Sequence, residues 1–350
     1  MNIIYSHTTA LEILRLPEMR EALARGSRSF TSVPERAPQN CDLDEAKERL
    51  PILAGLTEPV HVIVDNRSAR ANNEHLNCHL WSGEHPNGSV IELDYGIYCA
   101  SPEQLIVQMA QALEPLQLIV LISEMFSLYT IASHQRALVQ RDLPATTPER
   151  LADYLRRLGP VRGSAKARKA AGLAAVCSGS PQETRAALML SMPPRLGGHG
   201  LLVEALNQPM LVDAIGEQNK RYRKPDIMLV SHKGSDHVAI EYDGALHLTP
   251  ERQALDAART NELTAAGIPE YRLNKTLMAD FEYMEDLAAR IRKDLGEDPP
   301  HVNKQKARSQ RIARQELHSE LKAMDFASFR FAMSAEEKPI LPPLSEMARN

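Results

Sequence analysis

The sequence predicts a mixed α and β fold built as two domains. The chain has 350 residues, of which 43% are hydrophobic and 25% are charged, values typical of globular proteins with room for about two cores. Short stretches that alternate apolar and polar residues, as strands do, are interleaved with longer stretches of helical periodicity. We therefore expect a mixed sheet flanked by helices in residues 180–296, preceded by a smaller mixed α+β domain in residues 1–140.

The elements expected in the first domain follow from short-range signals. A helix over about 7–24 begins after Ser6 and is expected to kink at Pro17. Two further helices, near 102–113 and 116–131, come next, and Ser101-Pro102 is a typical cap and first-turn pair. Strands are expected at 60–64, 74–81, 90–94 and 97–99, the last two forming a hairpin.

Residues 141–179 are expected to form a basic helical linker that includes a helix over 147–158. Six cations fall within 14 residues and no acid separates them: Arg156, Arg157, Arg162, Lys166, Arg168 and Lys169. Such a strip binds phosphates with an affinity that falls steeply with salt. The alternative is a solvated helix face, and the net charge of −4 does not by itself indicate a nucleic-acid binder.

The second domain is expected to begin with a helix at Ser180-Pro181 and to end near residue 296. Strands are expected near 211–212, 227–230, 238–243 and 270–273, and helices over 249–266 and 276–295. Residues 297–350 are expected to hold a basic helix, 304–322, and a disordered tail. That helix either reaches DNA or is a solvated appendage.

The strongest candidate for a functional site is the hairpin formed by residues 226–243. Asp226 opens its first strand, and Glu241 and Asp243 share one face of the second, roughly 6–7 Å apart by the period of a strand. Clustered carboxylates repel one another unless a cation neutralises them, and oxygen ligands suit a hard cation such as Mg²⁺ or Mn²⁺. The alternative is a surface hairpin with scattered acids.

These residues resemble a known family. Pro225-Asp226 followed by Glu241-Tyr242-Asp243 resembles the PD-(D/E)xK nuclease superfamily, and Asp243–His247 is similar to the branch related to very-short-patch-repair endonucleases. Residues 180–184 are similar to the start of that family's first core helix, and 271–274 to a later core strand. The resemblance covers about 180–295. It implies a restriction-endonuclease-like core and a magnesium-dependent endonuclease that hydrolyses phosphodiester bonds in DNA, in repair, defence or a mobile element.

The resemblance also implies roles for individual residues. Asp226 and Glu241 would bind Mg²⁺ or Mn²⁺, and Asp243 would complete the site or bind a second ion. His247 would activate water or protonate the leaving oxygen, unless it only packs at the strand end. Arg259 would contact the phosphate or pair with Asp256.

Two features depart from the family or have a second explanation. Asp243 stands where the family usually has lysine, so Lys224, Lys233 or Lys275 would have to supply the missing charge. Glu183 fits a metal-proximal acid, but Ser180-Pro181-Gln182-Glu183 is also a capping box. The front half is loosely similar to abortive-infection antitoxin-like regulators. A nuclease-fold protein without activity, which binds nucleic acid or regulates a partner, is therefore the alternative function.

Other classes of site and location are less well supported by the sequence. Zinc ligation by His75, Cys78, His79 and His85 is disfavoured, because strand alternation sends Cys78 to the face opposite the histidines. The four cysteines show no CxxC spacing, which predicts a reducing cytoplasmic location without disulfides. No apolar run reaches the length of a membrane span, and no Gly-rich cofactor loop or Ser/His/Asp pattern indicates a small-molecule enzyme.

Overall fold

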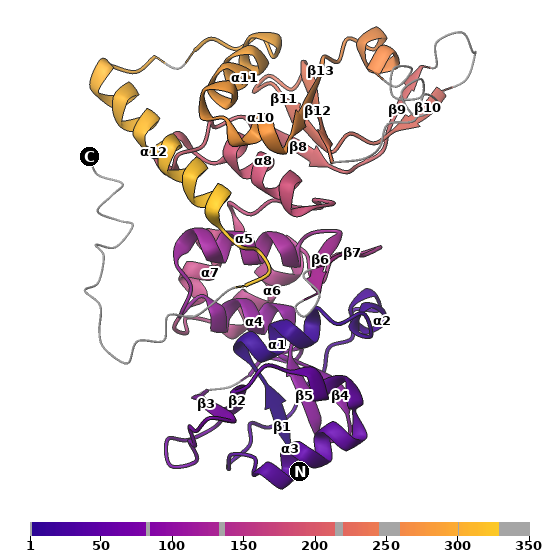
Figure 1. The fold of residues 1–350 in the computed structure, drawn as a ribbon, viewed down its shortest axis with the longest axis vertical. Coiled ribbons are helices and arrows are strands. Elements are labelled where there is room, and N and C mark those ends of the chain that lie inside the picture. Colours follow the sequence, from indigo (N-terminus) through magenta and orange to yellow (C-terminus); the bar gives the residue numbers. More distant parts are fainter. Residues whose placement is uncertain are drawn as a thin grey trace.

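The N-terminal sheet is mixed and has five strands in the order β3-β2-β1-β5-β4 (Figure 1). The computed structural model describes residues 2–81, 85–132, 137–213, 220–244, 260–299 and 301–328. The strands are β1 (Ile3–Tyr5), β2 (Val60–Val64), β3 (Leu76–Leu80), β4 (Val90–Asp94) and β5 (Ile97–Ala100). β1 is antiparallel to β2 and parallel to β5, and β2 is parallel to β3. The four strands predicted for this region are confirmed to within two residues, whereas β1 was not predicted.

Helices cover this sheet and continue beyond it. They are α1 (His7–Leu14), α2 (Met19–Ala24), α3 (Asn40–Arg49), α4 (Pro102–Met109), α5 (Pro115–Met125), α6 (Pro148–Leu158) and α7 (Ser164–Ala171), with a 3-10 turn at Pro51–Gly55. The expected helix over 7–24 is two helices, because Pro17 falls in the break between α1 and α2. The caps Ser101 and Thr147 accept hydrogen bonds from the backbone N–H groups of Gln104 and Arg150.

The segment expected to be a linker is part of the N-terminal body. α6 and α7 pack against α4, and α7 also packs against α5. Their apolar residues are the reason, since Leu151, Tyr154 and Leu155 are each 1% exposed. A short hairpin, β6 (Tyr129–Ala132) and β7 (Ala137–Gln140), completes this body.

The second sheet is mixed and has four strands in the order β13-β12-β11-β8. It consists of β8 (Leu202–Leu206), β11 (Ile227–Val230), β12 (His237–Asp243) and β13 (Glu270–Asn274). β8, β11 and β12 form an antiparallel meander, and β13 lies parallel to β12. α8 (Pro181–Ser191) precedes the meander, a helical stretch over 260–265 precedes β13, and α10 (Lys275–Ala279) and α11 (Phe281–Asp294) follow it. Among the described elements of this sheet and its helices, with β9 and β10 left aside, the order along the chain is therefore helix, three strands, helix, strand.

A separate ribbon of two strands projects from this sheet (Figure 1). It consists of β9 (Met210–Asp213) and β10 (Lys220–Arg223), which pair antiparallel. β10 ends only three residues before Asp226, so the ribbon leads directly into the acidic hairpin. The strand expected near 211–212 is β9, whereas β8 and β10 were not predicted.

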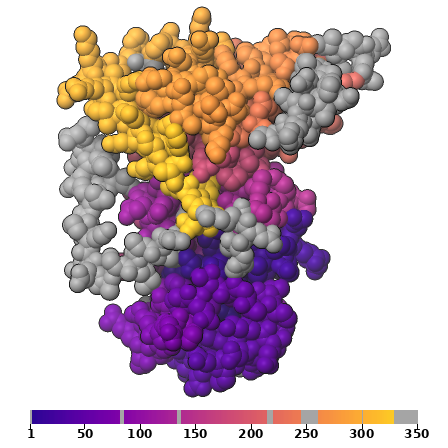
Figure 2. All heavy atoms as spheres, in the orientation of Figure 1, coloured from indigo at the N-terminus to yellow at the C-terminus, as the bar shows by residue number. Residues whose placement is uncertain are grey.

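The last helix of the described residues, α12 (Lys304–Ala323), joins the two bodies (Figure 2). It packs against α8 and the 3-10 turn η2 (Pro194–Leu196), and Leu317 and Leu321 are buried there. Gly197, whose φ is +86°, allows this approach, because a Cβ at Gly197 would meet the Ala313 carbonyl oxygen at 2.3 Å. The helix expected over 304–322 is confirmed, but its buried face shows that it is no solvated appendage.

The expected fold class, mixed α and β with mixed sheets flanked by helices, is confirmed. One continuous cluster of buried side chains runs through both bodies, from Ile3 on β1 to Ile227 on β11 and Leu321 on α12. Among the described helices, none has both the length and the apolar character needed to cross a bilayer.

Candidate functional site

The acidic hairpin brings Asp226 and Glu241 directly opposite each other. Ile227 pairs with Ile240, so continuing the antiparallel register by one residue places Asp226 across from Glu241 on the same face. The two strands are tied at this end, because the backbone N–H of Tyr242 donates to Asp226 Oδ2 at 2.7 Å. The sequence expectation that these carboxylates share one side of the sheet therefore agrees with the register.

The face that carries the carboxylates is partly closed. Met228 and Ala239 have the same strand parity as Asp226 and Glu241, and they pack with Leu263 of the helical stretch 260–265. Glu241 is only 8% exposed and Asp226 is half-buried. Asp243, two residues after Glu241 on the same face, has a half-exposed side chain. Glu241 is therefore sheltered from solvent, whereas Asp243 is accessible to it.

Glu183 reaches this end of the sheet from α8. Ser180 Oγ accepts the N–H of Glu183 at 3.2 Å, so Ser180 is the expected N-cap. The Glu183 carboxylate does not return to the Ser180 backbone, as a capping box requires; its Oε2 accepts from the Gly179 N–H and from Asn207 Nδ2, both at 2.6 Å. Capping alone therefore does not account for this buried acid.

Asn207 links Glu183 to the acidic hairpin. Its backbone N–H donates to the carbonyl oxygens of Pro225 and Asp226, each at 3.1 Å, while its side chain holds Glu183. Its φ is +53°, in the left-handed region that asparagine tolerates better than most residues. Sequence reasoning missed Asn207, because its contacts depend on how β8 pairs with β11.

We expect Asn207→Ala to lower the free energy of unfolding by about 2 kcal/mol or more. The change removes a hydrogen bond to a buried carboxylate, worth about 1.5–3 kcal/mol, and places a Cβ-bearing residue without a polar side chain at positive φ. Urea denaturation measures the loss. Asn207→Gly is the matched control, because it keeps the backbone conformation and loses only the side-chain bond. An alanine variant as stable as the wild type would contradict this role.

Arg272 supplies a positive charge beside the acids. It lies on β13, paired with Glu241 across the parallel strands. Its Nη1 is 3.4 Å from Asp243 Oδ1 and its Nε is 3.2 Å from Glu270 Oε1. The alternation of Glu270 and Arg272 along the predicted strand was a usable signal, but only the strand order shows that this strand lies next to β12.

The lysines proposed as substitutes are placed differently from one another. Lys233 lies in the turn between β11 and β12, at the far end of the hairpin from Asp226, so it is not a candidate. Lys275 begins α10 directly after the strand that pairs with Asp243, and Lys224 stands two residues before Asp226. Both lysines lie at the sheet end that carries Asp226, and Arg272 at the same end contacts Asp243 directly.

The other predicted site residues fall outside the described part of the chain or on the N-terminal body. His247, Asp256 and Arg259 are outside the described residues. Arg162, Arg168 and Lys169 are exposed on or beside α7, which packs on the helices of the N-terminal body. Lys166 of the same strip is half-buried, and its ammonium donates to the carbonyl oxygen of Leu113. The strip therefore does not belong to the sheet that carries the carboxylates, and Lys166 has a structural partner.

The four residues weighed for a zinc site contact different partners. His75 Nδ1 lies 2.5 Å from Glu58 Oε2, and the His85 ring is tilted against Trp81. Cys78 is buried, whereas His79 meets His61 from the neighbouring strand. The sequence relates His79 only to its neighbours along the chain. Its neighbours in space, His7 and His61, were therefore missed.

The donors at the acidic sheet end suit a hard divalent cation. They are carboxylate oxygens from adjacent strands that backbone pairing holds side by side, and the side chain of Glu241 is buried. Magnesium and manganese prefer this oxygen chemistry over nitrogen or sulfur ligands.

Comparison with protein-family models, with curated proteins and with solved structures gives no match to this chain.

Proposed function

We propose that this chain is a divalent-metal-dependent endonuclease that hydrolyses phosphodiester bonds in DNA. The observation that carries the proposal is the opposition of Asp226 and Glu241 at the end of a mixed sheet, with Asp243 beside them. The order helix, three strands, helix, strand supports it, because the resembling nucleases would place their first core helix, core hairpin and later strand in this sequence.

Each residue of the site has a role in this proposal. Asp226 and Glu241 hold the Mg²⁺ or Mn²⁺, with Asp243 as a further oxygen donor. The bound ion supplies charge stabilisation at the phosphate and a more acidic water. Arg272 brings the positive charge that lysine provides in the resembling family, and its guanidinium matches a phosphate oxygen pair. Asn207 holds Glu183 and the start of β11 in a fixed relation.

The ribbon of β9 and β10 offers a surface for nucleic acid beside the site. Its second strand begins the run Lys220-Arg221-Tyr222-Arg223-Lys224, four cations around one aromatic residue. Arg221 and Arg223 pair with the buried Glu262, and the exposed Lys220 lies 4.0 Å from Asp213. Tyr222 is 69% exposed and lies directly opposite Leu211, which is 51% exposed. Exposed aromatic side chains stack on bases, while cations near them attract the phosphate backbone. The exposed Tyr222 and its position next to the acidic hairpin support a nucleic-acid partner at this ribbon.

The alternative function is a nuclease-like protein that binds nucleic acid without cutting it. The contact between Arg272 and Asp243 favours it, because a carboxylate engaged by a guanidinium is a weaker ligand for a metal ion. The two functions differ in one measurable property, which is cleavage.

Metal removal tests the proposal directly. The purified chain is expected to nick supercoiled plasmid with Mg²⁺ or Mn²⁺, to stop when EDTA is added and to resume when Mg²⁺ is restored. Asp226→Asn is expected to lose this activity, whereas Asp286→Asn, an exposed aspartate on α11, should retain it. Parallel reactions with duplex DNA, single-stranded DNA and RNA identify the substrate. Equal nicking by wild type and Asp226→Asn would mean contamination; binding without cleavage would establish the alternative.

A further inference from the structure

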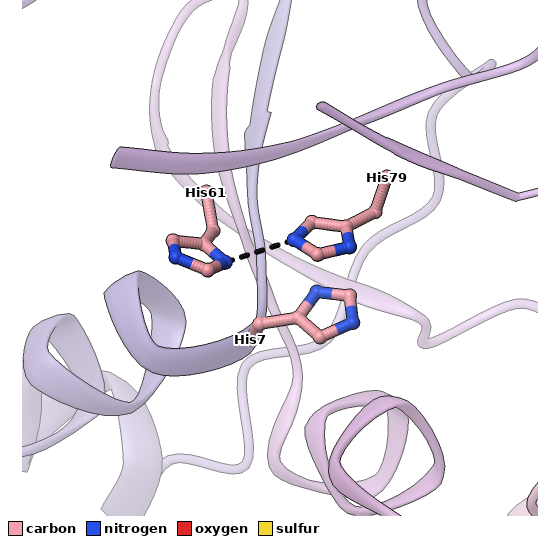
Figure 3. A group of neighbouring side chains, drawn as sticks. All are labelled: His7, His61 and His79. Atoms are coloured by element: carbon pink, nitrogen blue, oxygen red, sulfur yellow. Dashed lines mark hydrogen bonds between the residues drawn. The ribbon is translucent and has the colours of Figure 1, made fainter. Parts of the chain in front are cut away.

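Three histidines from distant parts of the chain converge in the N-terminal body (Figure 3). His7 is the first residue of α1, directly after β1, while His61 lies on β2 and His79 on β3. The parallel pairing of His61 with Asn77 and of Ile63 with His79 sends both strand histidines to the same face. The turn from β1 into α1 then delivers the third ring to that face.

The side-chain nitrogens of this group are close enough to share one ion. One ligand nitrogen from each residue lies within 4.8 Å of the others. His61 Nδ1 is 2.8 Å from His79 Nε2, and the ring of His7 stacks on that of His79 with centroids 3.6 Å apart. Three imidazoles packed this closely cannot all be charged. Burial lowers the pKa of His79 to about 3 and that of His7 well below its usual value, which is the direction of the neutral imidazole that metal ions bind.

Hydrogen bonds hold the backbone at two of these histidines, and one contact reaches a ring nitrogen. The His7 backbone N–H donates to Gln108 Oε1 at 3.1 Å, and Ser6 Oγ lies 3.1 Å from His7 Nδ1. The His61 backbone N–H donates to Thr9 Oγ1 at 2.8 Å. Polar groups that contact the second nitrogen of a histidine commonly orient it in metal sites, and the Ser6 hydroxyl stands in that place for His7.

We propose that His7, His61 and His79 bind one divalent transition-metal ion such as zinc. Imidazole nitrogens favour Zn²⁺, Cu²⁺ or Ni²⁺ over Mg²⁺, so this site is chemically distinct from the carboxylates of the second sheet. Three protein ligands leave one position for water or a substrate group. The ion ties together β2, β3 and the junction of β1 with α1.

Ion binding requires a small rearrangement of the cluster. Two nitrogens on one tetrahedral zinc ion lie roughly 3.3 Å apart, given Zn–N bonds of about 2.0–2.1 Å. The 2.8 Å contact between His61 and His79 therefore opens by about half an ångström, and the His7 ring turns from its stack so that a nitrogen faces the ion. The competing explanation is a metal-free group of core histidines linked by hydrogen bonds.

The metal content of the full chain decides between these explanations. After exposure to zinc and exhaustive dialysis, the wild type is expected to retain one zinc ion per chain. Inductively coupled plasma mass spectrometry measures this metal content. His61→Gln and His79→Gln are expected to lose it. His75→Gln, which changes an exposed histidine directly before β3, should retain it. Loading with Co²⁺ gives the intense visible absorption of a tetrahedral nitrogen site in the wild type.

The cobalt spectrum is read on wild-type protein, so the test stands even if a histidine variant does not fold. Zinc is also expected to raise the melting temperature of the wild type and not that of His79→Gln. Wild-type protein that retains no zinc and shows no cobalt band overturns the proposal. Retention that falls equally in His75→Gln overturns it as well. Neither result bears on the carboxylate site, whose metal and activity are measured separately.

Discussion

Replacing Glu241 by glutamine is expected to lower the rate of magnesium-dependent plasmid cleavage by at least about 10³-fold. The change removes an anionic ligand next to Asp226, and metal-ion charge stabilisation is worth several kcal/mol, or a factor of ten for each 1.36 kcal/mol. Glutamine has nearly the same shape, so the variant should fold. Single-turnover cleavage of a labelled duplex at saturating enzyme measures the chemical step.

The control for this change is Glu320→Gln, which makes the same chemical substitution at an exposed glutamate on α12. Its cleavage rate is expected to match the wild type. Titration calorimetry with Mg²⁺ should show weakened binding in Glu241→Gln only. A Glu241→Gln variant that still cleaves at the wild-type rate would show that Glu241 is not a metal ligand needed for cleavage. This conclusion is independent of the outcome of the histidine experiment.

Removing Glu124 is expected to lower the free energy of unfolding by about 3–5 kcal/mol. Arg15 and Glu124 form a bidentate ion pair, with distances of 2.9 Å and 2.6 Å, and their side chains are 2% and 1% exposed. Glu124→Ala would leave the Arg15 guanidinium buried without its carboxylate. Denaturation in urea, followed by circular dichroism, measures the loss.

The same arginine joins the end of the described chain to the N-terminal body. Arg15 donates to the carbonyl oxygens of Phe326 and Ala327, each at 2.9 Å, and Thr130 Oγ1 donates to Glu124. Glu124→Ala is therefore also expected to release the segment after α12, visible as faster proteolysis after that helix. The double variant Arg15→Met with Glu124→Leu should recover much of the stability, because neither partner of the pair is then left as a lone buried charge.

An exposed pair provides the comparison for this prediction. Arg49 and Asp94 contact each other at 2.6 Å, but water screens both. Asp94→Ala should therefore change the urea midpoint far less than Glu124→Ala. Similar midpoints for the two variants would show that burial does not set the cost of breaking the Arg15–Glu124 pair.

The acidic hairpin could be predicted because its information is local. Asp226, Glu241 and Asp243 flank two short apolar strands, and strand periodicity alone puts the last two on one face. Helix starts at Ser101, Thr147 and Ser180 were predicted for the same reason, since an N-cap acts within one helical turn.

Other elements were missed because neighbours in space decided them. β1 is a buried three-residue strand with no periodicity to detect. The alternating exposure of β8 depends on its pairing with β11 and on α8, which packs against it. The basic segment 141–179 has a polar composition, yet the apolar stripe of α6 packs it onto α4. Its charges indicated a linker, and its burial made it part of the core.

The sequence by itself determined the mixed fold class and the hairpin that carries the three carboxylates, because strand alternation and turn chemistry act between residues a few positions apart. Only the tertiary structure decided which charges and rings meet. Arg272 reaches Asp243 across a crossover, His7 joins His61 and His79 across a sheet, and Arg15 meets Glu124 from 109 residues away. Those contacts depend on strand order and helix packing, which a local pattern does not specify.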